Sequence, residues 1–254
     1  MHKVNAEFVK YAFASKGSLN EYLIATSKIE LWESEKILFG KYFKREEKII
    51  DIGCGTGRVT YGLHALGYNE LTGLDISEEM LQEAIKINSI RKTNIEFMLG
   101  DVTKLEAKNN SYDGAVFAYN GLMQIPWLKN RVKAFKEINR ILKVGGNFIF
   151  TTHDMDNVHE NVQRYWREEI ELWRKGKQNP RLAEFGDLIY KSYDREMYMH
   201  VPKREEIVNC LSETGFEIIE DIYRPDVFEE SEEVKYFSDD CRFWIVRKVI
   251  DVAL

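Results

Sequence analysis

A glycine-rich turn between an apolar run and a helix-forming segment constrains this chain more than any other feature. Residues 49–60 read IIDIGCGTGRVT, which places Gly53, Gly55 and Gly57 directly after a strand-like run. Glycines there permit a sharp turn and leave no Cβ in the way of a ligand, and the N–H groups of the following helix point to the same place. A dinucleotide fold needs G-x-G-x-x-G, and Arg58 occupies the position of its third glycine. The dinucleotide pattern therefore fails.

Short apolar runs alternate with amphipathic segments from residue 48 to residue 152. KIIDI, LTGLD, IEFML, GAVFAY and NFIFTT are continuous apolar runs, as expected for strands covered on both faces of a parallel sheet. Two later runs, FEIIEDIYRP and CRFWIVRKVI, follow each other with no helical pattern between them, which predicts an antiparallel pair at the sheet edge. The chain is thus predicted to be α/β, with a doubly wound, mostly parallel seven-stranded sheet and an antiparallel edge strand.

We predict one domain over residues 1–254, built of four parts. Residues 1–47 read as an N-terminal helical cap, and residues 48–152 as the core that binds a ligand. Residues 153–200 interrupt the alternation with a long helical pattern, NVHENVQRYWREEIELWRKGK, and a strand-like run, LIYKSYDREMYMH. Residues 201–254 hold the last helix, VPKREEIVNCLSETG, and the final strand pair. The aromatic-rich insertion is a predicted lid above the carboxyl edge of the sheet.

Acidic residues follow two further strands in the order that the glycine loop leads one to expect. Asp75 ends LTGLD, and Asp101 follows the third run in FMLGDVTKL. D-I-G-C-G-T-G together with these acids, FAYNGLMQIP and RILKVGGNFIF resembles the class I S-adenosylmethionine-dependent methyltransferases. The resemblance covers residues 48–152 and the final helix and strand pair. It implies a Rossmann-like fold, S-adenosyl-L-methionine as cofactor and S-adenosyl-L-homocysteine as product.

The resemblance also implies roles for individual residues. Asp75 would hold the two ribose hydroxyls, and Asp101 would accept from the adenine amino group while the backbone N–H of Val102 meets the ring. Asp51 either contacts the amino group of the cofactor or only orders the loop. Tyr119 and Asn120 would lie beside the methionine moiety, where Asn120 could also bond the acceptor. The expected cofactor-binding residues are Asp51, Gly53, Gly55, Gly57, Asp75, Ile76, Asp101, Val102, Tyr119 and Asn120.

The residues that bind the methyl acceptor are harder to predict from the sequence. Displacement at an activated methyl group needs alignment and a dry cavity rather than a fixed set of catalytic groups. His153, in TTHDMDNVH after the fifth strand, is the candidate catalytic or substrate-positioning residue. The same stretch could offer metal ligands, but we expect no metal. Tyr11, Tyr165 and Trp166 are candidate substrate contacts. Tyr11, Phe13 and Tyr22 are also candidates to close over the cofactor, with ordinary packing as the alternative. Trp166 and Trp173 are seven residues apart, so packing in a core is the competing interpretation.

Composition narrows the function further. The formal net charge is -6, and acidic residues in the insertion are at least as frequent as basic ones, so a nucleic-acid partner is not expected. Three cysteines at unrelated spacings and the lack of an apolar leader or membrane-length run favour a cytoplasmic protein. We expect transfer of a methyl group to an O or N nucleophile of a small-molecule acceptor. An RNA (tRNA) methyltransferase and a non-catalytic S-adenosylmethionine-binding protein are the alternatives, and the oligomeric state stays open.

Overall fold

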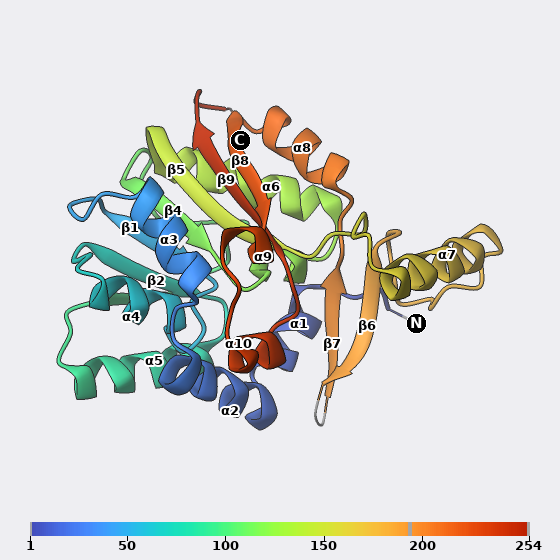
Figure 1. The fold of residues 1–254 in the computed structure, drawn as a ribbon, viewed down its shortest axis with the longest axis horizontal. Helices are drawn as coiled ribbons and strands as arrows, with labels where there is room; N and C mark the ends of the chain where they lie inside the picture. Colours follow the sequence, from blue (N-terminus) through green and yellow to red (C-terminus); the bar gives the residue numbers. More distant parts are fainter. Residues whose placement is uncertain (1, 193–194, 253–254) are drawn as a thin grey trace.

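A seven-stranded sheet in the order β3-β2-β1-β4-β5-β9-β8 organises the molecule (Figure 1). The computed structural model describes residues 2–192 and 195–252. The strands are β1 (Ile49–Ile52), β2 (Leu71–Asp75), β3 (Glu96–Leu99), β4 (Tyr112–Phe117), β5 (Leu142–Thr152), β8 (Phe216–Tyr223) and β9 (Arg242–Lys248). The pairings among β1 to β5 are all parallel. The predicted fold class is confirmed.

The last two strands form the antiparallel pair that the sequence predicts. β9 inserts between β5 and β8 and runs antiparallel to both. The outermost strand, β8, therefore runs in the same direction as β1 to β5. Two short helices, α9 (Arg224–Val227) and α10 (Glu232–Phe237), lie between the pair. The sequence predicts no helix there, because helices of four and six residues are too short to show a helical period.

Helices cover both faces of the sheet, and each face has its own apolar core. α6 (Leu128–Ile141) and α8 (Arg204–Glu213) cover one face, where Phe135 and Leu211 pack with Phe148 and Phe150 of β5. α3 (Glu33–Tyr42) and α4 (Arg58–Ala65) cover the other face, where their apolar side chains pack with Ile49 of β1. α5 (Glu78–Arg91) lies along β2 and β3. Both faces of β1 are buried, which explains its unbroken apolar pattern.

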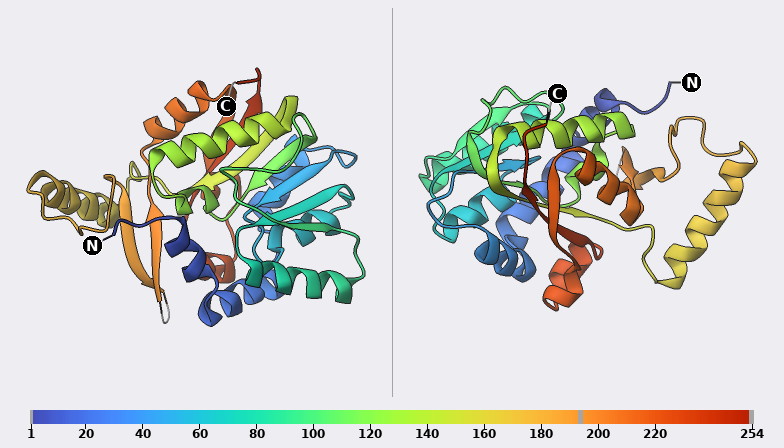
Figure 2. Two further views of the ribbon diagram at one scale, coloured as in Figure 1. Left: turned by 180° about the vertical axis from the view of Figure 1, so that it is seen from behind. Right: turned by 90° about the horizontal axis from the view of Figure 1, so that it is seen from above.

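The N-terminal segment is helical, as predicted. α1 (Ala6–Phe13) and α2 (Lys16–Ile24) each begin at a residue whose side chain caps the helix, Asn5 and Ser15. A π-helical turn, η1 (Ala25–Ile29), joins α2 to α3. Figure 2 shows α1 beside the base of the hairpin that follows α7.

The insertion contains a helix and a two-stranded hairpin. α7 (Glu160–Arg174) stands away from the sheet in all three views (Figures 1 and 2). The run 188–200, predicted to be one strand, is instead β6 (Asp187–Ser192) paired antiparallel with β7 (Arg195–His200); residues 193 and 194 lie outside the described part of the chain. Trp166 is buried with Met123, Met155 and Val201, so α7 is held to the body mainly by that apolar cluster.

Candidate functional site

The glycine loop after β1 adopts backbone conformations that other residues rarely take. Gly53 and Gly55 have φ of 65° and 56°. A Cβ on Gly53 would lie 2.7 Å from the ring of Phe117, and one on Gly55 would lie 2.9 Å from the ring of Tyr22. Both the left-handed backbone and the neighbouring rings therefore require glycine. The turn leaves a cradle of bare backbone at the carboxyl end of β1.

Asp75, at the end of β2, holds this loop through its carboxylate. Its Oδ2 accepts the N–H of Gly55 at 2.7 Å, and its Oδ1 accepts the N–H of Ser77 at 2.8 Å. Burial raises the pKa of the Asp75 carboxyl, and the backbone donors oppose that rise. Each carboxylate oxygen has lone pairs left, so Asp75 can order the loop and still accept from a pair of ligand hydroxyls.

Arg58, the residue that excluded a dinucleotide fold, connects the loop to the N-terminal cap. It opens α4 and donates two hydrogen bonds to the carboxylate of Glu35, at 2.6 and 2.7 Å. Glu35 has no solvent exposure and also accepts the backbone N–H of Trp32, over whose ring the guanidinium lies at 4.8 Å. The pair thus locks α3 against the start of α4.

Asp51 lies behind the loop rather than in the wall of a pocket. Its carboxylate accepts a 2.5 Å hydrogen bond from the hydroxyl of Thr60 on α4, and burial raises its pKa to about 7. Gly57, at φ 94°, caps α4 and does not line a pocket either. This geometry supports the loop-ordering interpretation of Asp51.

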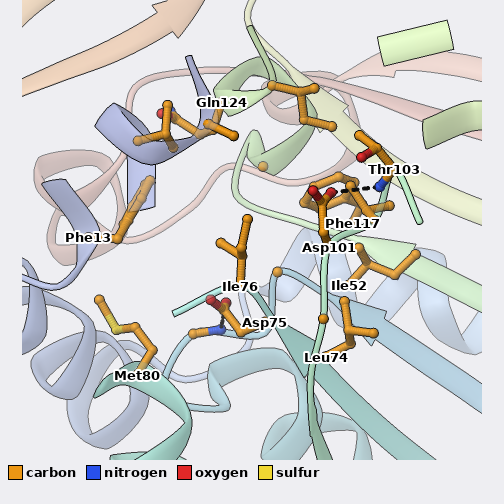
Figure 3. A pocket seen from close by; sticks show the side chains of 18 of the residues that line it. Phe13, Ile52, Leu74, Asp75, Ile76, Met80, Asp101, Thr103, Phe117 and Gln124 are labelled. Carbon is orange, nitrogen blue, oxygen red and sulfur yellow. Dashed lines mark hydrogen bonds between the residues drawn. The ribbon is translucent and has the colours of Figure 1, made fainter. Parts of the chain in front are cut away.

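A pocket at the carboxyl edge of the sheet brings most of the expected cofactor residues together. Gly53, Gly55, Asp75, Ile76, Asp101, Val102 and Tyr119 all line it. Figure 3 shows the side chains of Asp75 and Asp101 apart from each other, with Phe13 across the space from them. Asp101 accepts the N–H of Thr103 at 2.8 Å, which fixes its carboxylate. We call this space the cofactor pocket.

The features of the cofactor pocket fit S-adenosylmethionine. The cradle at Gly53 and Gly55 would be filled by any Cβ, two fixed carboxylates face separate parts of the space, and Ile52, Leu74 and Phe117 supply apolar walls. Two separated hydroxyl- or amine-accepting carboxylates with apolar surface between them match a nucleoside that carries a sulfonium side chain.

A second pocket adjoins the first and contains the expected acceptor residues. It encloses about 850 Å³ and is lined by His153, Tyr165 and Trp166, among others. Asn120, expected to bind the cofactor, lines this pocket instead. Phe13, Tyr22, Tyr119 and Gln124 line both spaces, so the two pockets share a wall. We call the second space the acceptor pocket.

Tyr119, in the shared wall, and its neighbour Asn120 have an uncommon backbone conformation. Their φ angles are 51° and 59°, both left-handed, and neither residue is glycine. The ring of Tyr119 stacks on Phe237 with a centroid distance of 5.2 Å, and the N–H of Asn120 donates to the Thr151 hydroxyl at 2.8 Å. Such conformations persist where the surroundings hold them, and they concentrate at functional sites.

His153 is placed beside Asn120 at the end of β5. Its Nδ1 lies 3.0 Å from the backbone carbonyl of Asp240, and its Nε2 lies 3.2 Å from Asn120 Nδ2. Burial lowers the pKa of His153, so the imidazole is neutral at physiological pH. Both ring nitrogens are occupied, which suits a positioning role better than that of a free base.

The three N-terminal aromatic residues expected near the cofactor lie in different surroundings. Tyr11 is 82% exposed and lines neither pocket. The same segment contributes Phe13 and Tyr22, whose rings meet edge to face at 5.8 Å. The helical spacing of α1 and α2 gave no means to tell which of these rings would face the sheet, and Gln124 was not singled out within FAYNGLMQIP.

A buried charged cluster fixes the base of the β6–β7 hairpin. His200 bonds Asp187 through Nδ1 at 2.9 Å and lies 3.1 Å from Glu206 on α8, while Arg131 on α6 pairs with both Glu206 and Glu184 at 3.0 Å. The neighbouring carboxylates raise the pKa of His200 against the effect of burial. Glu184, Asp187 and His200 lie close enough to hold a metal, but Glu184 is paired with Arg131, and the carboxylate of Asp187 is bonded to His200 and Tyr198.

Comparisons with known proteins agree with this geometry. Residues 49–146 match the model of a methyltransferase domain family. A demethylmenaquinone methyltransferase from Staphylococcus aureus is 28% identical over 225 residues, covering 85% of this chain and 87% of its own. A SAM-dependent methyltransferase from Methanosarcina mazei shares the fold with a TM-score of 0.69 at 22% identity, covering 87% of this chain and 99% of that one. The structure of a protein from Pyrococcus horikoshii OT3 matches with a TM-score of 0.61 at 20% identity, covering 95% of this chain and 96% of that one.

The fold and the cofactor pocket agree with those of a Rossmann-like methyltransferase. The chain contains a methyltransferase domain over residues 49–146, and its fold is that of the S-adenosylmethionine-dependent methyltransferases. Among residues 2–192 and 195–252, no helix combines the length and apolarity needed to cross a membrane. Cys54, Cys210 and Cys241 are buried free thiols.

Proposed function

We propose that this enzyme methylates an O or N nucleophile of a small-molecule acceptor bound in the acceptor pocket. The observation that carries the proposal is the wall shared by the two pockets, because methyl transfer needs the acceptor atom next to the cofactor. The relatives named demethylmenaquinone methyltransferase also point to a small-molecule acceptor. When bound, S-adenosylmethionine supplies a methyl group on a positively charged sulfur, which makes metal assistance unnecessary.

The residues of the chain would do the following work. Asp75 and Asp101 hold the nucleoside, and the backbone of Gly53 and Gly55 leaves room for it. Tyr22 and Tyr119 close the shared wall and exclude water from the reacting atoms. The chain thus contributes mainly alignment and a dry cavity.

The cofactor half of the proposal is tested by calorimetry with S-adenosylmethionine and S-adenosylhomocysteine. Asp75→Ala should weaken both ligands by at least about tenfold, because it removes charge-assisted hydrogen bonds and loosens the loop. Glu217→Ala, which removes an exposed acid from β8, is the matched control and should bind as the wild type does. An unchanged affinity in Asp75→Ala would refute the assignment.

The acceptor half is tested by transfer of labelled methyl from the cofactor to fractionated metabolite pools. The pools should include demethylmenaquinol, because of the named relatives, and bulk tRNA, because of the rival expectation. We expect label in a small molecule. Label in tRNA, with binding that falls steeply with salt, would replace this proposal by the nucleic-acid alternative.

A further inference from the structure

The side-chain amide of Asn120 occupies an unusual position between the two pockets. The residue is only 4% exposed and lines the acceptor pocket. Its backbone is fixed in the left-handed region by the bond from its N–H to Thr151. Its Oδ1 is buried and has no hydrogen-bond partner among the described residues. A buried carbonyl oxygen without a donor is costly, so its presence in an ordered wall calls for an explanation.

The ring of His153 determines the orientation of this amide, that is, where Nδ2 and Oδ1 of Asn120 point. The carbonyl of Asp240 only accepts, so Nδ1 of His153, 3.0 Å away, must carry the proton. In the neutral ring Nε2 is then an acceptor, and it lies 3.2 Å from Nδ2 of Asn120. The reverse amide orientation would put two acceptors face to face. The imidazole therefore holds the NH₂ group and leaves Oδ1 as an acceptor in need of a donor.

Three of the four carboxylates that line the acceptor pocket are paired within the protein, and the fourth, Asp239, has no ion pair in the described part of the chain. Asp154 pairs with Arg242 at 2.9 Å, Asp240 pairs with Arg224 at 2.8 Å, and Glu21 pairs with Arg195 at 3.6 Å. Its walls carry aromatic rings, with Tyr165 and Trp166 packed edge to face at 5.0 Å and Phe237 stacked on Tyr119. The aromatic walls and the remaining carboxylate favour a neutral aromatic ligand over an anion.

We propose that Asn120 determines acceptor specificity by accepting a hydrogen bond through Oδ1 from the hydroxyl of an aromatic acceptor, and that His153 is the positioning residue that sets its amide. This inference rests on the proposed function and names the acceptor class for the same pocket. A site built to bond a hydroxyl rejects the analogue that lacks it, because the protein oxygen is then left unpaired.

Protonation of His153 reverses the arrangement. An imidazolium carries a proton on Nε2 as well, which repels the NH₂ group and turns the amide so that Oδ1 faces the ring. The groups that face His153 are Asn120, the carbonyl and carboxylate of Asp240, the carboxylate of Asp239 and the guanidinium of Arg224. A hydroxyl bound to Oδ1 favours the neutral ring, so by linkage it must lower the pKa of His153.

The test uses the protein loaded with S-adenosylhomocysteine, in which no transfer occurs, and two probes that share a naphthalene ring. 1-Naphthol carries the hydroxyl, and 1-methoxynaphthalene carries a methyl ether in its place. Calorimetry should show 1-naphthol binding about fivefold more tightly to the wild type, and ¹⁵N NMR of the histidine rings should show the pKa of His153 falling with 1-naphthol only. In Asn120→Leu the two probes should bind equally, with unchanged affinity for S-adenosylhomocysteine.

Several results would overturn the inference and leave the proposed function in place. These are equal affinity of the two probes for the wild type, no binding of either probe beside bound S-adenosylhomocysteine, and a ring of His153 protonated on Nε2. Loss of S-adenosylhomocysteine affinity in Asn120→Leu would assign Asn120 to the cofactor, as the sequence predicted. Failure of the wild type to bind S-adenosylhomocysteine would instead refute the cofactor half of the proposed function.

Discussion

The buried pair of Arg58 and Glu35 should dominate the stability of the contact between the N-terminal cap and the core. Arg58→Met leaves a carboxylate of zero exposure without its two donated bonds of 2.6 and 2.7 Å. Removing one partner of a buried pair costs about 3–5 kcal/mol, a large share of a typical free energy of unfolding. The variant also loses the contact of the guanidinium with the ring of Trp32.

The double variant Arg58→Met, Glu35→Leu should be more stable than Arg58→Met alone. It leaves no buried charge, and its main remaining loss is the hydrogen bond from the Trp32 N–H at 2.9 Å, worth about 1 kcal/mol. Urea unfolding followed by circular dichroism gives the free energies, and comparable slopes validate the comparison. The control is Lys36→Met on the same helix, which breaks an exposed pair with Glu33 and should cost about 0–1 kcal/mol. Additive losses in the double variant would refute this reasoning.

Three further predictions follow from single side chains. Gly55→Ala should weaken S-adenosylhomocysteine binding roughly tenfold in calorimetry, because of its left-handed backbone and the ring beside it, whereas Gly40→Ala on α3, with open space around it, should not. The pKa of His200 is raised, so this residue adds stability that is complete below about pH 6.5 and is lost as pH rises through the folded pKa. The difference in Tm between the wild type and His200→Gln should therefore shrink over that range. A constant difference would contradict the assignment. Asp51 has a pKa of about 7, so its carboxyl binds a proton more tightly in the folded protein than in the unfolded protein. The wild type should therefore lose stability relative to Asp51→Asn as pH rises from about 4 to 7. Above that pH the difference in stability should level off.

The cofactor side was predictable from the sequence because its elements are local. The glycine pattern and the acids Asp75 and Asp101 each follow a strand, and parallel strands bring their carboxyl ends to one edge. Seven of the ten expected residues consequently lie in one pocket wall. The exceptions are also local in origin: Asp51 and Gly57 serve the loop and the helix cap, and Asn120 turns to the other side of the shared wall.

The acceptor side was harder to predict because distant segments build it. Phe13 and Tyr22 reach the site only when the cap packs on the core, a contact that no periodicity encodes. The hairpin of the insertion escaped detection because LIYKSYDREMYMH contains no glycine or proline to indicate a turn. The role of Arg58 was invisible for the same reason, since Glu35 lies 23 residues away in another helix.

The position of Tyr22 has a kinetic consequence. Its ring lies against the glycine loop, meets Phe13 and Tyr119 edge to face, and belongs to a cap that contributes Ala6 and Val9 to the same pocket. We therefore expect exchange of product for fresh cofactor to involve separation of residues 2–24 from the core, a local opening rather than global unfolding. The residence time of S-adenosylhomocysteine should follow the amide hydrogen-exchange rate of α1 and α2, so turnover can be limited by a segment that takes no part in the chemistry.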